Sequence, residues 1–147
     1  MISTSYGMTS GNEGGFASAE EVRPKLLVVD DSPLIRGIIT LALERGGYRT
    51  CCAAGGDEAR AIIAVEPPAM LITDLSMPSG DGWELIAFCR ARWAQLPILI
   101  VSGLPRGTRP EVESSANGYI TKPFGCHRLL AEVARLVTLN LACAAVR

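Results

Sequence analysis

Residues 25–47 read KLLVVDDSPLIRGIITLALERGG, and this stretch contains the signals that decide the fold. It opens on four apolar residues, 26–29, a run of the length and composition of a strand buried on both faces. Ser32 and Pro33 follow as an N-cap and a first helical residue, and Gly46-Gly47 ends the helix. Between these signals runs an apolar stripe at helical spacing, made of Leu34, Ile35, Ile38, Leu41 and Ala42. A buried strand followed at once by a capped helix predicts the start of a βαβ unit.

The same alternation continues along the chain. Further strands are expected at residues 48–53, 70–73, 98–101 and 118–121, and apolar residues at helical spacing lie between and after them. The last helix is expected around Leu129, Leu130, Val133, Leu136 and Val137. Five strands alternating with helices predict a parallel α/β sheet that is covered on both faces and connected by right-handed crossovers.

Length and composition predict one folded domain. The chain has 147 residues, of which 48% are apolar and 20% charged, which is typical of a globular protein. Residues 1–22 are rich in serine, glycine and threonine, so we expect a flexible leader there and the domain at 23–147. A net charge of −1, with no local run of lysine or arginine, argues against direct binding to nucleic acid.

Cysteine usage and hydropathy indicate a cytoplasmic protein. The five cysteines are odd in number and form no C-x-x-C pair, so reduced thiols are expected rather than disulfides or a zinc site. The first residues lack the basic head and apolar run of a signal peptide. The longest apolar stretch, 129–146, is interrupted by Glu132, Arg135 and Asn140, so no membrane insertion is expected.

Polar residues stand where the predicted strands end. Asp30 and Asp31 follow the first strand, Asp74 the third, Ser102 the fourth and Lys122 the fifth. Because ligand sites of open parallel sheets form at the carboxyl ends of the strands, these side chains should converge. Each one alone has an ordinary explanation as a turn, cap or solvated residue. The whole set at these positions instead predicts a functional site.

The charges of this set indicate its chemistry. Three neighbouring carboxylates repel one another, and a hard divalent cation such as Mg²⁺ relieves that repulsion. Lys122 can neutralise a phosphoryl oxygen, and the Ser102 hydroxyl can donate to another. Asp74 can then attack phosphorus and form an aspartyl phosphate, while the other groups position it and neutralise charge.

Five segments together resemble the response regulator receiver family of two-component signalling. They read LLVVDDSPLIR, AAGGDEA, LITDLSMPSGDGWEL, LPILIVSG and GYITKPF, within about residues 25–137. The resemblance implies a flavodoxin-like, doubly wound sheet of strand order 2-1-3-4-5 with five helices. It implies that Asp74 is the phosphoacceptor and that Mg²⁺ is held by Asp30, Asp31, Asp74 and the backbone carbonyl of Ser76. Ser102 and Lys122 would bind the phosphoryl group, with Ser102 and Tyr119 as switch residues. Tyr119 can equally be a half-buried strand aromatic without a switching role.

The resemblance also implies partners. A histidine kinase or histidine phosphotransfer protein would donate the phosphoryl group, and the chain would catalyse only its own phosphorylation and dephosphorylation. Output would pass through protein contacts, a relay, or a homodimer formed by the apolar last helix. Three alternatives stay open: a phosphate-independent interaction domain, a phosphatase with an aspartate nucleophile, and a flavin-binding protein. The intact polar set argues against a phosphate-independent interaction domain. Such phosphatases usually have a second acid two residues after the nucleophile, and this chain has Ser76 there. A flavin-binding protein of this fold would have a Ser/Thr-rich loop after the first strand, and this chain has none there.

Residues 104–117, LPRGTRPEVESSAN, depart from the family pattern. The family usually has a well-formed helix here. Two prolines, a glycine and few apolar residues predict at most a short helix, beginning near Pro110, in a mobile segment.

Overall fold

The computed structural model describes residues 23–78 and 81–146, with side chains described up to residue 139. The expected leader, residues 1–22, lies outside this part. The elements are, in chain order, β1 (Lys25–Val29), α2 (Pro33–Arg45), β2 (Arg49–Ala53), α3 (Gly56–Val65), β3 (Met70–Thr73), α4 (Gly82–Arg92), β4 (Ile98–Ser102), α5 (Pro110–Glu113), β5 (Gly118–Thr121) and α6 (Cys126–Val146). The predicted alternation of five strands with helices is therefore confirmed.

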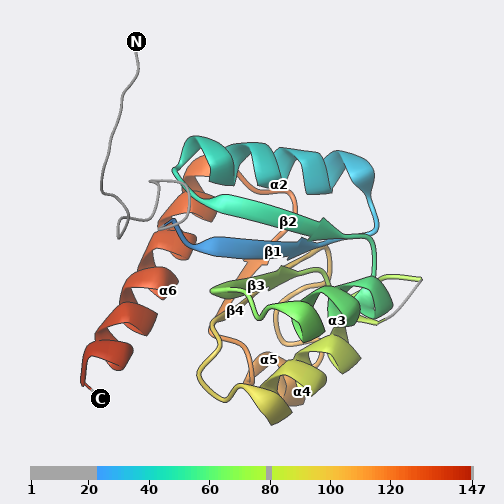
Figure 1. Ribbon diagram of the computed structural model, residues 1–147. Helices are drawn as coiled ribbons and strands as arrows, with labels where there is room; N and C mark the ends of the chain where they lie inside the picture. The colour runs from blue at the N-terminus through green and yellow to red at the C-terminus, as the bar shows by residue number, and fades with distance from the viewer. Residues whose placement is uncertain (1–22, 79–80, 147) are drawn as a thin grey trace.

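The five strands form one parallel sheet in the order β2-β1-β3-β4-β5, as the family resemblance implied. Helices α2 and α6 cover one face, and α3, α4 and α5 lie on the other (Figure 1). Alternate residues of β1 point to opposite layers: Leu26 and Val28 pack with the α2 side, Leu27 and Val29 with the α3 side. Every residue of β3 and β4 is buried, which explains why these strands are apolar up to their last residues, Thr73 and Ser102.

Helix α2 begins and ends where its sequence signals lie. The Ser32 hydroxyl accepts a hydrogen bond from the Ile35 amide at 3.2 Å, Pro33 is the first helical residue, and Gly46 caps the end. Gly47 has a φ of +98°, a conformation that glycine adopts without strain. Part of the apolar stripe nevertheless faces solvent: the exposed large apolar side chains of this helix are Leu34, Ile38 and Leu41. Apolar residues surround more of α2 than the sheet covers. Of the predicted stripe, Ala42 is buried and Ile35 partly buried, and the helix also buries Ile39 and Leu43, which the stripe did not include.

Helix α5 is a single turn that begins at Pro110, as the departure from the family pattern predicted. The preceding loop is held by Glu113, whose carboxylate accepts from the amides of Gly107 at 2.7 Å and Arg109 at 2.9 Å. The expected mobility of residues 104–117 stays a prediction.

Arg90 ties the end of α4 to the start of β5. Its guanidinium donates to the carbonyls of Ala94 at 2.8 Å, Leu96 at 2.8 Å and Ser115 at 2.7 Å. It also reaches Asn117 Oδ1, which accepts from the Ile98 amide that opens β4. One side chain thus satisfies carbonyls that the end of α4 and two loops leave unpaired. Its hydrogen bonds thus connect the end of α4 to the segments that open β4 and β5.

The cysteines with described side chains, Cys51, Cys52, Cys89 and Cys126, form no disulfide with one another. Their reduced state stays a prediction. Cys143 lies beyond the described side chains. Within the described residues, no helix combines the length and the hydropathy needed to cross a membrane. The Lys122–Pro123 peptide bond is cis.

Candidate functional site

The three predicted carboxylates meet at the carboxyl edge of the sheet. Asp30 and Asp31 directly follow β1, and Asp74 follows the adjacent strand β3. One carboxylate oxygen from each residue lies within 4.8 Å of the other two. Asp30 and Asp74 are buried, with exposed fractions of 1% and 7%, whereas Asp31 is open to solvent. Such a cluster accumulates negative charge at one rim of the domain.

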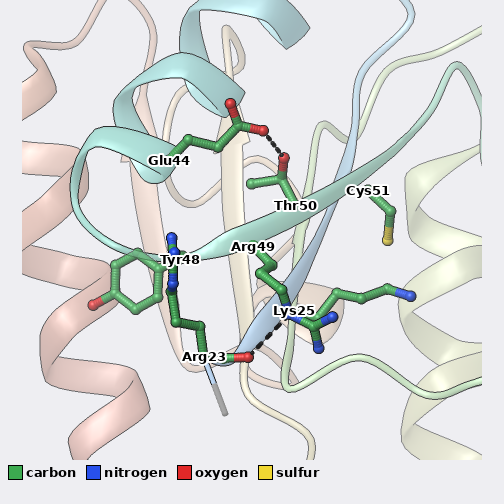
Figure 2. A pocket seen from close by; sticks show the side chains of 7 residues that line it. All are labelled: Arg23, Lys25, Glu44, Tyr48, Arg49, Thr50 and Cys51. Atoms are coloured by element: carbon green, nitrogen blue, oxygen red, sulfur yellow. Dashed lines mark hydrogen bonds between the residues drawn. The ribbon is translucent and has the colours of Figure 1, made fainter. Parts of the chain in front are cut away.

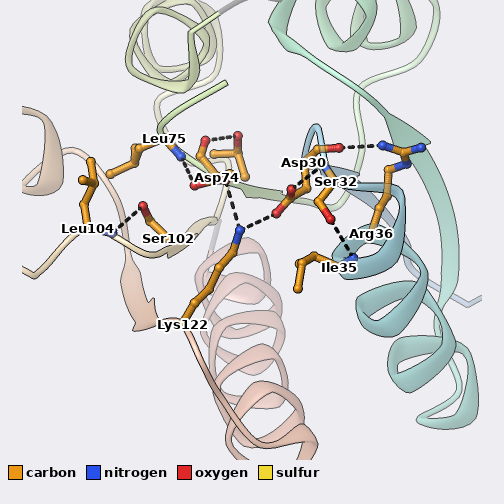
Figure 3. A network of polar contacts seen from close by, with 10 residues as sticks. Asp30, Ser32, Ile35, Arg36, Asp74, Leu75, Ser102, Leu104 and Lys122 are labelled. Carbon is orange, nitrogen blue, oxygen red and sulfur yellow. Dashed lines mark hydrogen bonds and ion pairs between the residues drawn. The ribbon is translucent and has the colours of Figure 1, made fainter. Parts of the chain in front are cut away.

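Lys122 supplies positive charge to the cluster from the end of β5. Its Nζ lies 2.8 Å from Asp30 Oδ2 and 3.1 Å from Asp74 Oδ2, so it bridges the two buried acids (Figure 3). Burial alone would lower the pKa of Lys122. The hydrogen bonds and charges of Asp30 and Asp74 outweigh that effect and raise the pKa above its ordinary value. The ammonium group is therefore charged at neutral pH.

All the polar groups of Asp30 have partners. Its amide donates to the Ala53 carbonyl at 3.2 Å, and its Oδ1 accepts from the Ser32 amide at 2.9 Å. Its backbone carbonyl accepts from Arg36 Nη1 at 2.6 Å. The sequence reasoning did not single out Arg36. The only signal available was an arginine one turn into the helix that follows the acid pair.

Asp74 is held by its immediate neighbours. Its Oδ1 accepts from the Leu75 amide at 2.7 Å, and its backbone carbonyl accepts from the Thr73 hydroxyl at 2.7 Å. Gly82, the first residue of α4, packs directly against this backbone, and a side chain there would collide with the Asp74 carbonyl oxygen. These contacts leave Asp74 Oδ2 facing Lys122 and the acidic cluster.

Ser102 and Tyr119 meet on the backbone of Leu104. Ser102, fully buried at the end of β4, accepts at Oγ from the Leu104 amide at 3.2 Å. The Tyr119 hydroxyl donates to the Leu104 carbonyl at 2.7 Å. Burial raises the pKa of Tyr119, and the charge of Glu113 adds to that effect. Both expected switch residues therefore contact the same loop residue, and the Tyr119 ring is buried.

The donor set fits a hard divalent cation. Three carboxylates face one lysine, so the cluster retains an excess of negative charge that a single monovalent partner cannot neutralise. Carboxylate oxygens are also the protein ligands that Mg²⁺ prefers. Ser76, whose backbone carbonyl was expected to join this set, lies exposed two residues after Asp74.

A second hollow lies at the opposite ends of β1 and β2, with a volume of about 470 Å³ (Figure 2). It is lined by Arg23, Lys25, Glu44, Tyr48, Arg49, Thr50 and Cys51. Part of its polar surface is bonded internally, since Thr50 Oγ1 donates to Glu44 at 2.7 Å and Arg49 Nε to the Arg23 carbonyl at 3.2 Å. None of the predicted site residues lines it. The carboxylate edge is therefore the candidate functional site.

Sequence comparisons point to one family. The family model of the response regulator receiver domain matches residues 26–134 of the sequence. The chain is 32% identical over 143 residues to the sensor histidine kinase TmoS of Ectopseudomonas mendocina, covering 95% of this chain and 15% of that protein. It is 33% identical over 123 residues to the transcriptional regulatory protein PmrA of Pectobacterium parmentieri, covering 79% of this chain and 53% of that protein. The chain thus spans about half or less of the length of these curated relatives.

Solved structures agree. The chemotaxis protein CheY4 of Vibrio cholerae superposes with a TM-score of 0.73 at 29% identity, over 78% of this chain and 99% of that one. The receiver domain of the Francisella response regulator 1452 superposes with a TM-score of 0.73 at 31% identity, over 79% of this chain and 98% of that one. The response regulator TrrA of Thermotoga maritima, solved in complex with Mg(2+)-BeF, superposes with a TM-score of 0.72 at 26% identity, over 77% of this chain and 98% of that one.

Proposed function

The chain belongs to the response regulator receiver domain family, and from this premise we propose that it accepts a phosphoryl group on Asp74 beside a bound Mg²⁺ ion. The donor would be a histidine kinase or a histidine phosphotransfer protein. The observation that carries the proposal is the convergence of Asp30, Asp31, Asp74 and Lys122, from three separate strand ends, on one edge of the sheet.

In the proposed reaction, an Asp74 carboxylate oxygen attacks the phosphorus of the donor phosphohistidine. A new P–O bond forms while the P–N bond breaks, and its electron pair stays on the imidazole nitrogen. Lys122 leaves its ion pair with Asp74 to neutralise a phosphoryl oxygen, and the Ser102 hydroxyl donates its hydrogen to another. Asp30, Asp31, Asp74 and the Ser76 carbonyl would hold Mg²⁺, which lowers the charge repulsion between carboxylate and phosphoryl oxygens.

The signal would pass through Leu104. Ser102 Oγ now accepts from the Leu104 amide, and Tyr119 donates to its carbonyl. If Ser102 turns toward a phosphoryl oxygen, its bond to the Leu104 amide is strained or lost, and the Tyr119 anchor shifts with the loop. Residues 104–117 and the β5 edge would then present a changed surface to a protein partner, so that output passes through protein contacts.

The remaining expectations belong to the same proposal. Residues 23–147 would form the receiver domain, acting in the cytoplasm and catalysing only its own phosphorylation and dephosphorylation. A homodimer through α6 stays a prediction; Leu139, the last residue with a described side chain, is 55% exposed there. Sedimentation of the full chain with and without beryllofluoride would decide it, and a monomer in both states would rule it out.

The decisive test is labelling with acetyl phosphate and Mg²⁺, followed by intact mass spectrometry. The wild-type chain should gain one base-labile phosphoryl group, and Asp74→Asn should gain none because an amide oxygen is a poor nucleophile. Asp57→Asn, on the exposed start of α3, is the matched control and should label normally. Labelling of Asp74→Asn at the wild-type level, or full labelling of the wild type in EDTA, would contradict the proposal. A folded wild type that never labels would favour a phosphate-independent interaction domain.

A further inference from the structure

Arg36 connects the first turn of α2 to the end of β1. Its backbone amide donates to the Ser32 carbonyl at 2.9 Å, as the first helical hydrogen bond requires. Its side chain turns back, and Nη1 donates to the Asp30 carbonyl at 2.6 Å (Figure 3). The side chain is half-buried, so the contact is partly shielded from water. A charged donor at this distance forms one of the stronger classes of hydrogen bond.

The Asp30 carbonyl belongs to the peptide group that joins Asp30 to Asp31. Because that group is planar, fixing its oxygen fixes the direction in which the backbone enters Asp31. The Asp31 carboxylate has no hydrogen bond or ion pair within the described part of the chain. Asp30, in contrast, is held at its amide and at both carboxylate oxygens. The place of Asp31 in the acidic cluster therefore depends on its backbone, and Arg36 restrains that backbone.

We propose that Arg36 is a positioning residue that orients Asp31 toward the cation shared by the three carboxylates. The inference rests on the proposed function, because it assumes that the cluster binds a divalent cation.

Two effects of Arg36 on cation binding have opposite signs, and this makes the proposal decidable. Its positive charge repels a cation, so its removal would tighten binding if charge alone mattered. Its hydrogen bond orients a ligand, so its removal would weaken binding if positioning dominates. Groups that orient metal ligands from outside are typically worth about 10- to 100-fold in affinity. We therefore expect a net loss of about tenfold.

The experiment titrates full-length variants with Mg²⁺ and monitors binding through the amide chemical shifts of the residues around Asp31. Arg36→Met keeps most of the side-chain length and removes the charge and the donors, and its affinity should fall about tenfold. Arg36→Lys keeps a charged donor of nearly the same reach and should recover most of that loss. Arg45→Met removes one exposed charge from the last turn of the same helix and should bind like the wild type. If Arg36→Met fails to fold, Arg36→Gln, which is also uncharged but too short to reach Asp30, replaces it.

A second measurement separates positioning from contact with the phosphodonor. At subsaturating Mg²⁺, Arg36→Met should label slowly with acetyl phosphate, and saturating Mg²⁺ should restore a near wild-type rate. A residue that binds the donor would instead leave Mg²⁺ affinity unchanged and lower the saturated rate.

Affinity that is unchanged or tighter in Arg36→Met or Arg36→Gln would overturn the inference, as would a loss confined to the saturated rate. Failure of the wild type to bind Mg²⁺ would overturn the proposed function and the inference together. Mg²⁺ binding without labelling would overturn only the phosphoacceptor role of Asp74. The ratio of the Mg²⁺ affinities of Arg36→Met and the wild type would still decide the role of Arg36.

Discussion

The carboxylate site contains more negative charge than its own residues neutralise. Asp30, Asp31 and Asp74 lie together, and Lys122 forms ion pairs with Asp30 and Asp74 but none with Asp31 within the described residues. Like charges at these separations repel, and under the proposed function a bound divalent cation would relieve this repulsion. A residue of such a site can therefore reduce stability while it serves function.

Replacement of Asp31 tests whether its charge lowers the stability of the cation-free domain. Asp31→Asn removes one of three mutually repelling charges without changing the shape of the side chain. In EDTA at neutral pH, its free energy of unfolding should exceed that of the wild type by about 1 kcal/mol. Addition of Mg²⁺ should stabilise the wild type, because the ion binds only the folded chain, and should barely affect the variant. Urea denaturation with and without Mg²⁺ measures both effects. A variant less stable than the wild type in EDTA would show that the Asp31 carboxylate makes favourable contacts instead.

The sequence identified the residues whose roles depend on where strands end. Asp30, Asp74, Ser102 and Lys122 each stand at the end of a predicted strand, and the structure brings them to one edge. Arg36 was missed because its partner is a backbone carbonyl, and no side-chain pattern reports such a contact. Likewise, two roles for Tyr119 stayed open because its bond to the Leu104 carbonyl depends on how the loop folds, which no local pattern determines.

At the scale of elements, the junction between β3 and α4 is shaped by a close approach of backbones. Gly82 begins α4, and its amide donates to the Leu75 carbonyl at 3.1 Å. The position where a Cβ would stand is 2.8 Å from Leu75 Cα and collides with the Asp74 carbonyl oxygen. Only glycine fits without moving the backbone of Asp74 and Leu75.

Gly82→Ala should therefore destabilise the domain by about 3 kcal/mol, because backbone atoms must shift to admit the methyl group. It should also slow labelling of Asp74, whose backbone would move. Gly37→Ala is the matched control: Gly37 lies on the exposed side of α2 with open space around it, and alanine there should stabilise by about 0.5–1 kcal/mol. Thermal and urea unfolding of the two variants check both signs. A Gly82→Ala protein as stable as the wild type would disprove the steric argument.

Element boundaries were predictable where capping residues or glycines mark them, as at both ends of α2 and at Pro110. The exposed face of α2 was not predictable, because its apolar stripe is wider than one contact face. Which side packs on the sheet depends on the register of α2 against β1 and β2, and this is a tertiary property.

At the scale of the whole molecule, the site exists only when the fold is complete. The Lys122–Asp30 contact joins residues 92 positions apart, and the Lys122–Asp74 contact joins residues 48 positions apart. Parallel strands with helical crossovers produce such long-range contacts at one edge. The strand order followed from the family resemblance, whereas alternation alone predicted only a parallel sheet.

The global stability of the domain should fall in alkaline solution, chiefly because of Cys89. This thiol is fully buried on the inner face of α4, and burial raises its pKa to about 11 from an ordinary value near 9. The unfolded chain therefore loses this proton first, so stability is complete below about pH 9 and declines as pH rises toward 11. The loss should be on the order of 2 kcal/mol. The raised pKa values of Lys122 and Tyr119 act in the same direction, because each keeps its proton longer in the folded state.

Urea denaturation at several pH values under reducing conditions measures this loss. Cys89→Ala starts from a lower stability, because it leaves a small cavity, but its pH dependence should be shallower than that of the wild type. Cys126→Ala, at the exposed start of α6, should keep the wild-type slope. If Cys89→Ala and the wild type lose stability in parallel between pH 9 and 11, another group carries the alkaline transition and the buried thiol is not its cause.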